Sequence, residues 1–211
     1  MIDATIHYRE RLEHFKSESN EPGGIVLLGS SHLEWFDTAN FLPQWRFVNR
    51  GIASDRIGVT ERGILHRLDV SVFDLSPACV ILQNGVNDLG ELWRTGEPAV
   101  AKIVACYEQV VARIQAKLPD TPFAIVSVLP TTGEFAGITP WIAPFNVELK
   151  RIAKEANLDF INFYPDVVGS DDQLRPELTY DGLHLNDDGY QLYAKRLNTY
   201  LEGLELAHRS M

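Results

Sequence analysis

At 211 residues and a net charge of −10, the chain is long enough to bury one substantial core and carries too little positive charge for a nucleic-acid partner. Hydrophobic residues make up 45% and charged residues 23%, which is typical of an ordinary globular protein. We therefore expect a single domain over residues 1–211, whose acidity mildly disfavours strongly anionic substrates.

The sequence also argues against a membrane or secreted setting. Residues 1–20 carry charges throughout and lack the apolar core of a signal peptide. No later stretch approaches the roughly 20 apolar residues of a membrane span. The two cysteines, Cys79 and Cys106, are too few for a disulfide framework and are expected to be reduced. These features predict a cytoplasmic protein.

Short apolar runs alternate with amphipathic segments along the chain. In chain order, the sequence predicts a helix over residues 4–18, a strand over 25–28, a strand over 46–49, a helix over 55–68, a strand over 78–83, a helix over 100–118, a strand over 123–128, a helix over 141–156, a strand over 159–163 and a last helix from Asn186. The strands are continuous apolar runs, as in parallel sheets covered on both faces. The pattern predicts an α/β fold with one parallel sheet.

Local residues support two of these boundaries. Pro22-Gly23-Gly24 ends the first helix, because neither proline nor glycine favours helical continuation. Ser54 or Asp55 is a suitable cap for the helix that runs to Leu68. The inner face of that helix is expected to carry Ile57, Ile64, Leu65 and Leu68.

Polar residues follow three of the strands and precede the last helix. Ser31 follows the first strand, Gly51 the second and Asn87 the third. Asp181 and His184 lie in the loop before the last helix. Because the carboxyl ends of parallel strands share one edge of the sheet, these residues are expected to converge on one cleft.

Each of these residue types has a chemical use in such a cleft. The Ser31 hydroxyl needs a base before it can attack, and His184 is a candidate for that base. Asp181 can orient the imidazole and stabilise its charged form. The backbone N–H groups of Ser31 and Gly51, with the side-chain amide of Asn87, can donate to a developing oxyanion.

Four sequence blocks carry a family resemblance when they are taken together and in order. They are Gly29-Ser30-Ser31, Asn49-Arg50-Gly51, Gly85-Val86-Asn87-Asp88 and Asp181-Gly182-Leu183-His184. With these blocks the chain resembles the SGNH, or GDSL-type, serine hydrolase superfamily. As a short, single-domain chain, it resembles the platelet-activating-factor acetylhydrolase-like branch of that superfamily.

The resemblance implies a three-layer, flavodoxin-like α/β/α fold with a five-stranded parallel sheet in the order 2-1-3-4-5. It also implies a cofactor-independent serine esterase that cleaves acetyl or other short acyl groups from a sugar, a lipid or another small alcohol. Ser31 would be the nucleophile in this scheme, with His184 and Asp181 completing the triad. Ser30 stands where the family has aspartate, which raises a question about loop packing rather than about mechanism.

Side chains near the strand exits are candidates for a substrate pocket, although ordinary packing explains them equally well. They are His32, Trp35, Trp93, Phe135 and Trp141. The other histidines, His7, His14, His66 and His208, are expected to be solvated. The pairs Asp171-Asp172 and Asp187-Asp188 lack the spacing of a calcium loop, so no metal and no cofactor is expected.

Two other functions remain open from the sequence. An acyl-enzyme could be resolved by an alcohol rather than by water, which would make the protein an acyltransferase. The chain could also be a carbohydrate-binding module that kept the fold without catalysis. Neither the particular small-molecule ester nor the oligomeric state follows from the residues.

Overall fold

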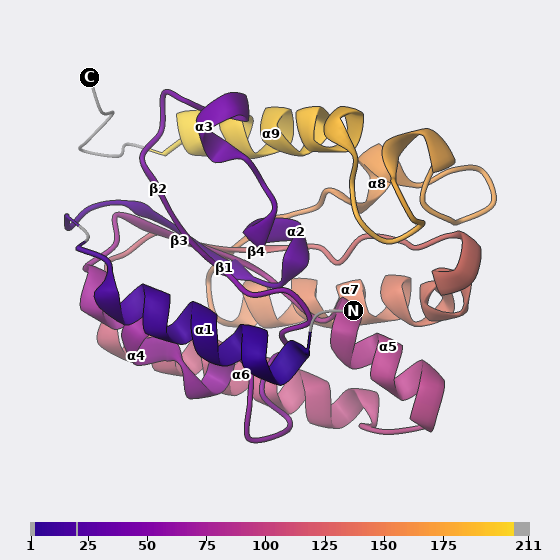
Figure 1. Cartoon of the computed structure of the whole chain (residues 1–211), viewed down its shortest axis with the longest axis horizontal. Coiled ribbons are helices and arrows are strands. Elements are labelled where there is room, and N and C mark those ends of the chain that lie inside the picture. The colour runs from indigo at the N-terminus through magenta and orange to yellow at the C-terminus, as the bar shows by residue number, and fades with distance from the viewer. Residues whose placement is uncertain (1–2, 20, 205–211) are drawn as a thin grey trace.

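Five parallel strands form one sheet in the order β2-β1-β3-β4-β5 (Figure 1). The computed structural model describes residues 3–19 and 21–204. The strands are β1 (Ile25–Gly29), β2 (Phe47–Gly51), β3 (Cys79–Gln83), β4 (Phe123–Val126) and β5 (Asp159–Ile161). The α/β class and the strand order expected from the sequence are confirmed.

Helices cover both faces of the sheet, as Figure 1 shows. One face carries α1 (Ala4–Ser17), α4 (Leu68–Ser71), α5 (Val86–Thr95), α6 (Val100–Lys117) and α7 (Thr139–Glu155). The other carries α2 (Ser31–Glu34), α3 (Thr38–Phe41), α8 (Tyr164–Val167) and α9 (Asp187–Glu202). Short 3-10 turns complete the described elements, namely η1 (Ile64–His66), η2 (Phe73–Leu75), η3 (Gly133–Ile138) and η4 (Pro176–Leu178). None of the helices described is both long and apolar enough to cross a bilayer.

The position of strand β1 in the sheet explains why its sequence is apolar without interruption. Val26 and Leu28 belong to the core under one layer of helices, whereas Ile25 and Leu27 belong to the core under the other. Successive side chains of a strand point to opposite faces, so a central strand with helices on both sides has no solvent-facing position. The short run therefore places the end of β1 in the middle of the sheet edge.

The helix expected over residues 55–68 does not form, and this prediction was wrong. Only the 3-10 turn η1 and the single turn α4 occur in that part of the chain. Gly58 and Gly63 both have φ near +129°, a conformation that breaks any helix. The carboxylate of Asp55 binds Arg67 instead of capping a helix. The apolar residues that suggested the inner face of a helix, Ile57, Ile64, Leu65 and Leu68, are nevertheless buried.

Helix α5 is an element that the sequence did not predict. It begins at Val86, immediately after the Asn84-Gly85 turn that leaves β3, and Gly85 has φ of +126°. The first turn of α5 therefore carries Asn87 and Asp88 at the edge of the sheet. Neither Cys79 nor Cys106 is paired with another cysteine among the described residues, and Cys79 is buried whereas Cys106 is partly buried.

Candidate active site

The corner that follows β1 holds Ser31 at the centre of the sheet edge. Gly29 ends the strand, and a Cβ placed there would lie 2.2 Å from the carbonyl oxygen of Gln83. Glycine is therefore required for β1 and β3 to approach at this point. Ser30 is extended and precedes α2, which begins at Ser31. This turn fixes Ser31 in a position where only 4% of the residue is exposed.

Three side chains from distant parts of the chain form one line of contacts. His184 Nδ1 lies 2.7 Å from Asp181 Oδ2, and His184 Nε2 lies 3.0 Å from Ser31 Oγ. The Asp181 carboxylate can only accept, so Nδ1 carries the proton and Nε2 of the neutral ring accepts from the Ser31 hydroxyl. The convergence of these residues expected from the sequence is present in the structure.

Asp181 is held as a carboxylate by the loop that contains it. Partial burial by itself would raise the pKa of this group. The N–H of His184, its ring and the N–H of Leu183 all donate to the carboxylate, and together they hold the pKa of Asp181 below its ordinary value. An ionised carboxylate beside His184 favours both the ring orientation and the charged imidazolium.

Two contacts fix the loop that carries Asp181 and His184. Gly182 has φ of +90°, and a Cβ there would lie 2.4 Å from the carbonyl oxygen of Thr132. His32 Nε2 lies 2.9 Å from the carbonyl oxygen of Leu183. Burial, followed by the neighbouring His184, lowers the pKa of His32 to about 4, so this ring is neutral and donates through Nε2–H. His32 therefore holds the loop through its hydrogen bond to Leu183.

A cleft of about 370 Å³ opens over Ser31 and His184. It is lined by Ala4, His7, Ser31, Trp35, Ala53, Ser54, Arg56, Asn87, Arg94, Phe135, Leu183 and His184. An adjoining pocket of about 80 Å³ is lined by Val86, Asn87, Gly90, Trp93, Arg94, Phe135, Ile138 and Leu183. The two cavities share Asn87, Arg94, Phe135 and Leu183 as lining residues and therefore lie next to each other.

Some of the expected pocket residues line these cavities and others do not. Trp35 lines the cleft and packs on His184, with 4.3 Å between ring centroids. Trp93 and Phe135 line the adjoining pocket. His32 is buried and does not line either cavity. Trp141 lies on α7 outside both, so its assignment to the substrate pocket is corrected.

The expected oxyanion donors are also only partly present. Asn87 lines the cleft, and one hydrogen of its amide is donated to the carbonyl oxygen of Asp55 at 3.0 Å, which leaves the second hydrogen free. The assignment of Gly51 as an oxyanion donor is corrected, because its N–H already donates to Asn49 Oδ1 at 2.9 Å. A Cβ at Gly51 would lie 2.2 Å from the backbone nitrogen of Glu34, so close packing explains this glycine.

Ser54 is a cleft residue that sequence reasoning missed. Its φ of +62° is in the left-handed region, which is unusual for serine. Within residues 3–19 and 21–204, no hydrogen-bond acceptor is assigned to its N–H. Ser54 lines the cleft beside Ser31 and Asn87. The only sequence signal was its place five residues after Asn49, in a segment interpreted as a helix start.

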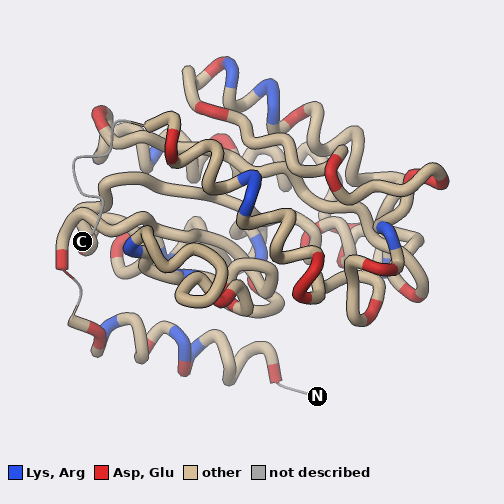
Figure 2. Tube along the Cα trace, turned by 90° about the horizontal axis from the view of Figure 1, so that it is seen from above, with Lys and Arg blue, Asp and Glu red and all other residues tan. Residues whose placement is uncertain are grey.

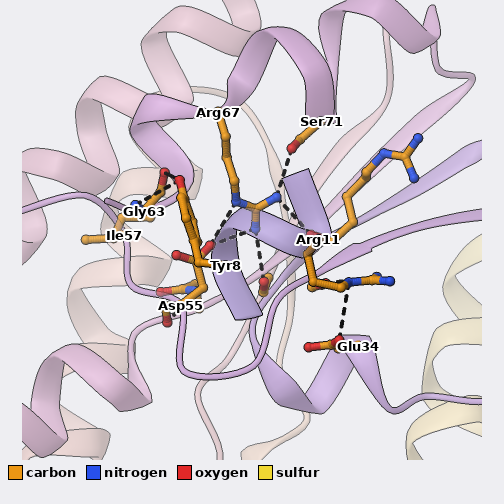
Figure 3. Close-up of polar contacts among 12 residues, drawn as sticks. Tyr8, Arg11, Glu34, Asp55, Ile57, Gly63, Arg67 and Ser71 are labelled. Atoms are coloured by element: carbon orange, nitrogen blue, oxygen red, sulfur yellow. Dashed lines mark hydrogen bonds and ion pairs between the residues drawn. The ribbon is translucent and has the colours of Figure 1, made fainter. Parts of the chain in front are cut away.

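His7 is a second residue whose position the sequence did not reveal. It lines the cleft, and its Nε2 lies 3.0 Å from both carboxylate oxygens of Glu34. Glu34 also pairs with Arg11 Nε at 3.2 Å (Figure 3). Its carboxylate accepts from the N–H of Ala53 as well. The expectation that His7 is solvated was wrong, since its side chain is only 19% exposed and is paired with Glu34.

The remaining histidines fit the solvated expectation where the structure describes them. His14 and His66 are exposed. His208 lies outside the described residues. In the portion of the chain that the structure describes, no group of three or more His, Cys, Asp or Glu side chains is arranged to hold a metal ion.

Asp88, next to Asn87, is a buried carboxyl group with a backbone partner. It is 0% exposed and accepts from the N–H of Ile57 at 3.1 Å, as expected for a structural residue that bonds loop backbone. Burial raises the pKa of Asp88 to about 7, although the Ile57 N–H and the charge of Arg56 favour its ionised form. This carboxyl group therefore keeps its proton to a much higher pH in the folded protein than in the unfolded chain.

We expect Asp88→Asn to change how stability depends on pH. Between about pH 4 and pH 7 the folded state keeps the Asp88 proton that the unfolded state has released, so the wild-type free energy of unfolding falls by up to about 1.4 kcal/mol per pH unit from this group. This stabilising contribution is present below pH 4 and is lost as the pH rises through about 7. Urea unfolding of both proteins between pH 4.5 and 8 measures the difference, and parallel curves would contradict the assignment.

Comparisons with known proteins agree with this fold. The model of the GDSL-like lipase/acylhydrolase family matches residues 32–192, which begin directly after Ser31, so the chain belongs to this family of esterases and acylhydrolases. A search of curated proteins found no match.

Solved structures show the same fold at low sequence identity. A Streptococcus pneumonia protein named as a platelet activating factor has a TM-score of 0.83 and 22% identity over 94% of each chain. A GDSL-like lipase from Bacteroides thetaiotaomicron has a TM-score of 0.80 and 22% identity, over 92% of this chain and 97% of the other. A catalytic mutant of an acetylxylan esterase from Geobacillus stearothermophilus has a TM-score of 0.68 and 15% identity, over 90% of this chain and 99% of the other.

Proposed function

We propose that the protein hydrolyses acetyl or other short acyl esters through an acyl-enzyme on Ser31. The observation that carries this proposal is the continuous line of contacts from Asp181 through His184 to the Ser31 hydroxyl, at 2.7 Å and 3.0 Å. Both distances are short enough for direct proton transfer between the two groups. The same serine opens directly into the cleft.

The proposed reaction has two stages. In the first, Ser31 Oγ attacks the ester carbonyl while His184 Nε2 takes the hydroxyl proton, and His184 then returns that proton to the departing alcohol. In the second, a water molecule loses a proton to His184 and attacks the acyl carbonyl. The ester bond to Ser31 then breaks, His184 returns the proton to Ser31 Oγ, and the carboxylic acid is released. Asp181 orients the ring and stabilises its charged form in both stages.

Three N–H groups around the cleft are suited to hold the oxyanion. They belong to the backbone of Ser31, the backbone of Ser54 and the side chain of Asn87. Ser54 replaces Gly51, the donor expected from the sequence, because the Gly51 N–H is already bonded to Asn49. Such preorganised donors act where charge develops in the transition state.

The size of the cavities favours a small acyl group and a small alcohol. The cleft of about 370 Å³ accommodates a compact ester, and the pocket beside it, about 80 Å³, suits a short apolar group. Acetyl esters are also what the acetylxylan esterases among the structural neighbours act on. Acetylated sugars and short synthetic esters are therefore the first substrates to test.

A fluorophosphonate probe tests whether Ser31 is the activated nucleophile. We expect one equivalent of probe to bind the wild-type protein and to be recovered by mass spectrometry on the peptide that contains Ser31. A folded protein that remains unlabelled, or a label on Ser30, would contradict the proposal. Preincubation with a substrate ester should slow the labelling, since both compete for the same serine.

We expect Asn87→Ala to lower kcat for a short acyl ester by about 10²- to 10³-fold, because one oxyanion donor is lost. KM should change much less, since the donor acts mainly in the transition state. Steady-state kinetics measure both constants. Asn198→Ala is the matched control, because Asn198 bonds Gln44 and Trp45 away from the cleft. Equal losses of kcat in the two variants would contradict the role of Asn87.

A further inference from the structure

Two arginines, Arg56 and Arg94, line the cleft that contains Ser31. They come from different segments, because Arg56 follows the Ser54 turn and Arg94 lies in the last turn of α5. Among the described residues that line the cleft, none is aspartate or glutamate. The cleft therefore presents cationic groups beside the nucleophile.

The two guanidinium groups share a single carboxylate. Glu91 Oε2 accepts from Arg56 Nη2 at 2.9 Å and from Arg94 Nη2 at 2.8 Å. One negative charge facing two positive charges leaves a surplus of one positive charge. Each guanidinium has five N–H donors, so most of these donors remain available to a ligand. The side chains are 27% and 62% exposed, which leaves both accessible from solvent.

Other carboxyl groups near the cleft do not cancel this surplus. Asp55 is buried and is paired with Arg67. Asp88 is buried, and its raised pKa keeps it partly protonated near neutral pH. Asp181 keeps its negative charge beside the neutral ring of His184, but it does not line the cleft. The overall charge of −10 is a property of the whole chain, and Figure 2 shows its acidic residues spread over the trace and interspersed with basic ones.

Guanidinium groups recognise carboxylates and phosphates through paired, charge-assisted hydrogen bonds. Arg94 also borders the apolar pocket that contains Trp93 and Phe135. A ligand that fits the whole region is therefore one with an ester at Ser31 and an anionic oxygen group at the arginines.

We propose that the preferred substrate is an ester that also carries an oxyanion, either a carboxylate or a phosphate, which Arg56 and Arg94 bind while Ser31 attacks the ester. This inference rests on the proposed function. It reverses, for this cleft, the expectation that an acidic protein disfavours anionic substrates. The surplus positive charge is local, and local charge decides what binds at short range because salt screens distant charges.

Matched acetyl esters test this preference. The compounds are 4-acetoxybenzoate, 4-acetoxyphenyl phosphate and the neutral methyl 4-acetoxybenzoate, and the quantity measured is the ratio of kcat/KM for each anionic ester to that for the neutral one. We expect Arg56→Gln and Arg94→Gln each to lower this ratio roughly tenfold. Glu91→Gln should raise the ratio, because it removes the competing carboxylate. Comparison of the two anionic arms identifies which oxyanion is preferred.

Arg151→Gln is the control, because Arg151 lies on α7 and pairs with Glu108, Glu148 and Glu155. Its ratio should equal that of wild type. Unchanged ratios in both Arg56→Gln and Arg94→Gln would overturn the inference. The wild-type ratio should also fall as salt is added, since partly exposed charges are screened.

A binding measurement separates this inference from the proposed function. Ser31→Ala protein is titrated with the three esters, and the fluorescence of the cleft tryptophans reports binding whether or not the wild type hydrolyses them. Tighter binding of an anionic ester, lost in Ser31→Ala/Arg94→Gln, supports the anion site even where hydrolysis fails. Equal binding of the anionic and neutral esters would overturn it, even where hydrolysis succeeds.

Discussion

We expect Ser31→Ala to lower kcat for a short acyl ester by about 10⁴- to 10⁶-fold, the range typical of removing the nucleophile of a serine hydrolase triad, if Ser31 has the role proposed above. The reason is that the remaining groups can still bind the ester and polarise its carbonyl but can no longer form the acyl-enzyme. The rate is measured under saturating substrate with highly purified protein. The residual rate should not respond to fluorophosphonate.

Ser30→Ala is the matched control for this experiment. Ser30 is 2% exposed, and its side chain makes no hydrogen bond to cap α2. We expect this variant to keep most of the activity, with a loss that reflects loop packing rather than chemistry. The result that contradicts the assignment is a Ser30→Ala protein as inactive as Ser31→Ala, or a Ser31→Ala protein as active as wild type.

The catalytic convergence could be predicted because it depends on topology. Parallel strands end at one edge, so a serine after β1 and a histidine before α9 meet there whatever the details of the loops. The contacts of His184 with Ser31 and Asp181 follow that expectation.

The proposed oxyanion donor at Ser54 could not be predicted in the same way. The Asn49 side chain accepts the N–H of Gly51, so that this N–H is not available to a ligand. A sequence pattern does not show which backbone N–H a side chain will bind. Ser54 reaches the cleft through a left-handed conformation that serine does not ordinarily adopt. A sequence pattern reports average preferences, whereas this turn is held by long-range contacts to Glu34 and Asp88.

The false helix over residues 55–68 has a similar explanation. Apolar residues at helical spacing report burial, and Ile57, Ile64 and Leu65 are indeed buried. Arg67, a polar residue of the same segment, is buried as well. Its guanidinium is buried and needs hydrogen-bond acceptors, which the surrounding chain supplies, among them the carboxylate of Asp55 (Figure 3).

Arg67 joins three segments that border the candidate active site. It donates to Asp55 Oδ2 at 2.9 Å, to the carbonyl oxygen of Arg50 at 2.9 Å, to Ser71 Oγ at 2.9 Å and to the carbonyl oxygen of Gly29 at 3.1 Å. Gly29 precedes the nucleophile corner, and Asp55 follows Ser54. The side chains of Arg67 and Asp55 are 0% and 1% exposed.

We expect Arg67→Met to lower the free energy of unfolding by about 3–5 kcal/mol, because Asp55 is left as a buried charge without its partner. The activity of the folded fraction should fall as well, since the corner at Gly29 and the turn at Ser54 lose a common anchor. Urea unfolding followed by tryptophan fluorescence measures the stability, and kcat per folded molecule measures the effect on the site.

Arg196→Met provides the matched comparison, because Arg196 makes an equally short pair with Asp166 at 2.7 Å while its side chain is 45% exposed. An exposed pair of this kind contributes at most about 1 kcal/mol. Losses of similar size in the two variants would show that burial of the Arg67 pair has no special energetic role.

The double variant Arg67→Met/Asp55→Leu distinguishes an uncompensated charge from a lost anchor. Removing both charges takes away the desolvation cost of Asp55, so we expect the double variant to be more stable than Arg67→Met alone. Its activity should remain low, because methionine cannot hold the carbonyl oxygens of Gly29 and Arg50. Recovery of stability without recovery of kcat would show that the ion pair positions the site. Recovery of both would show that Arg67 serves only to neutralise Asp55.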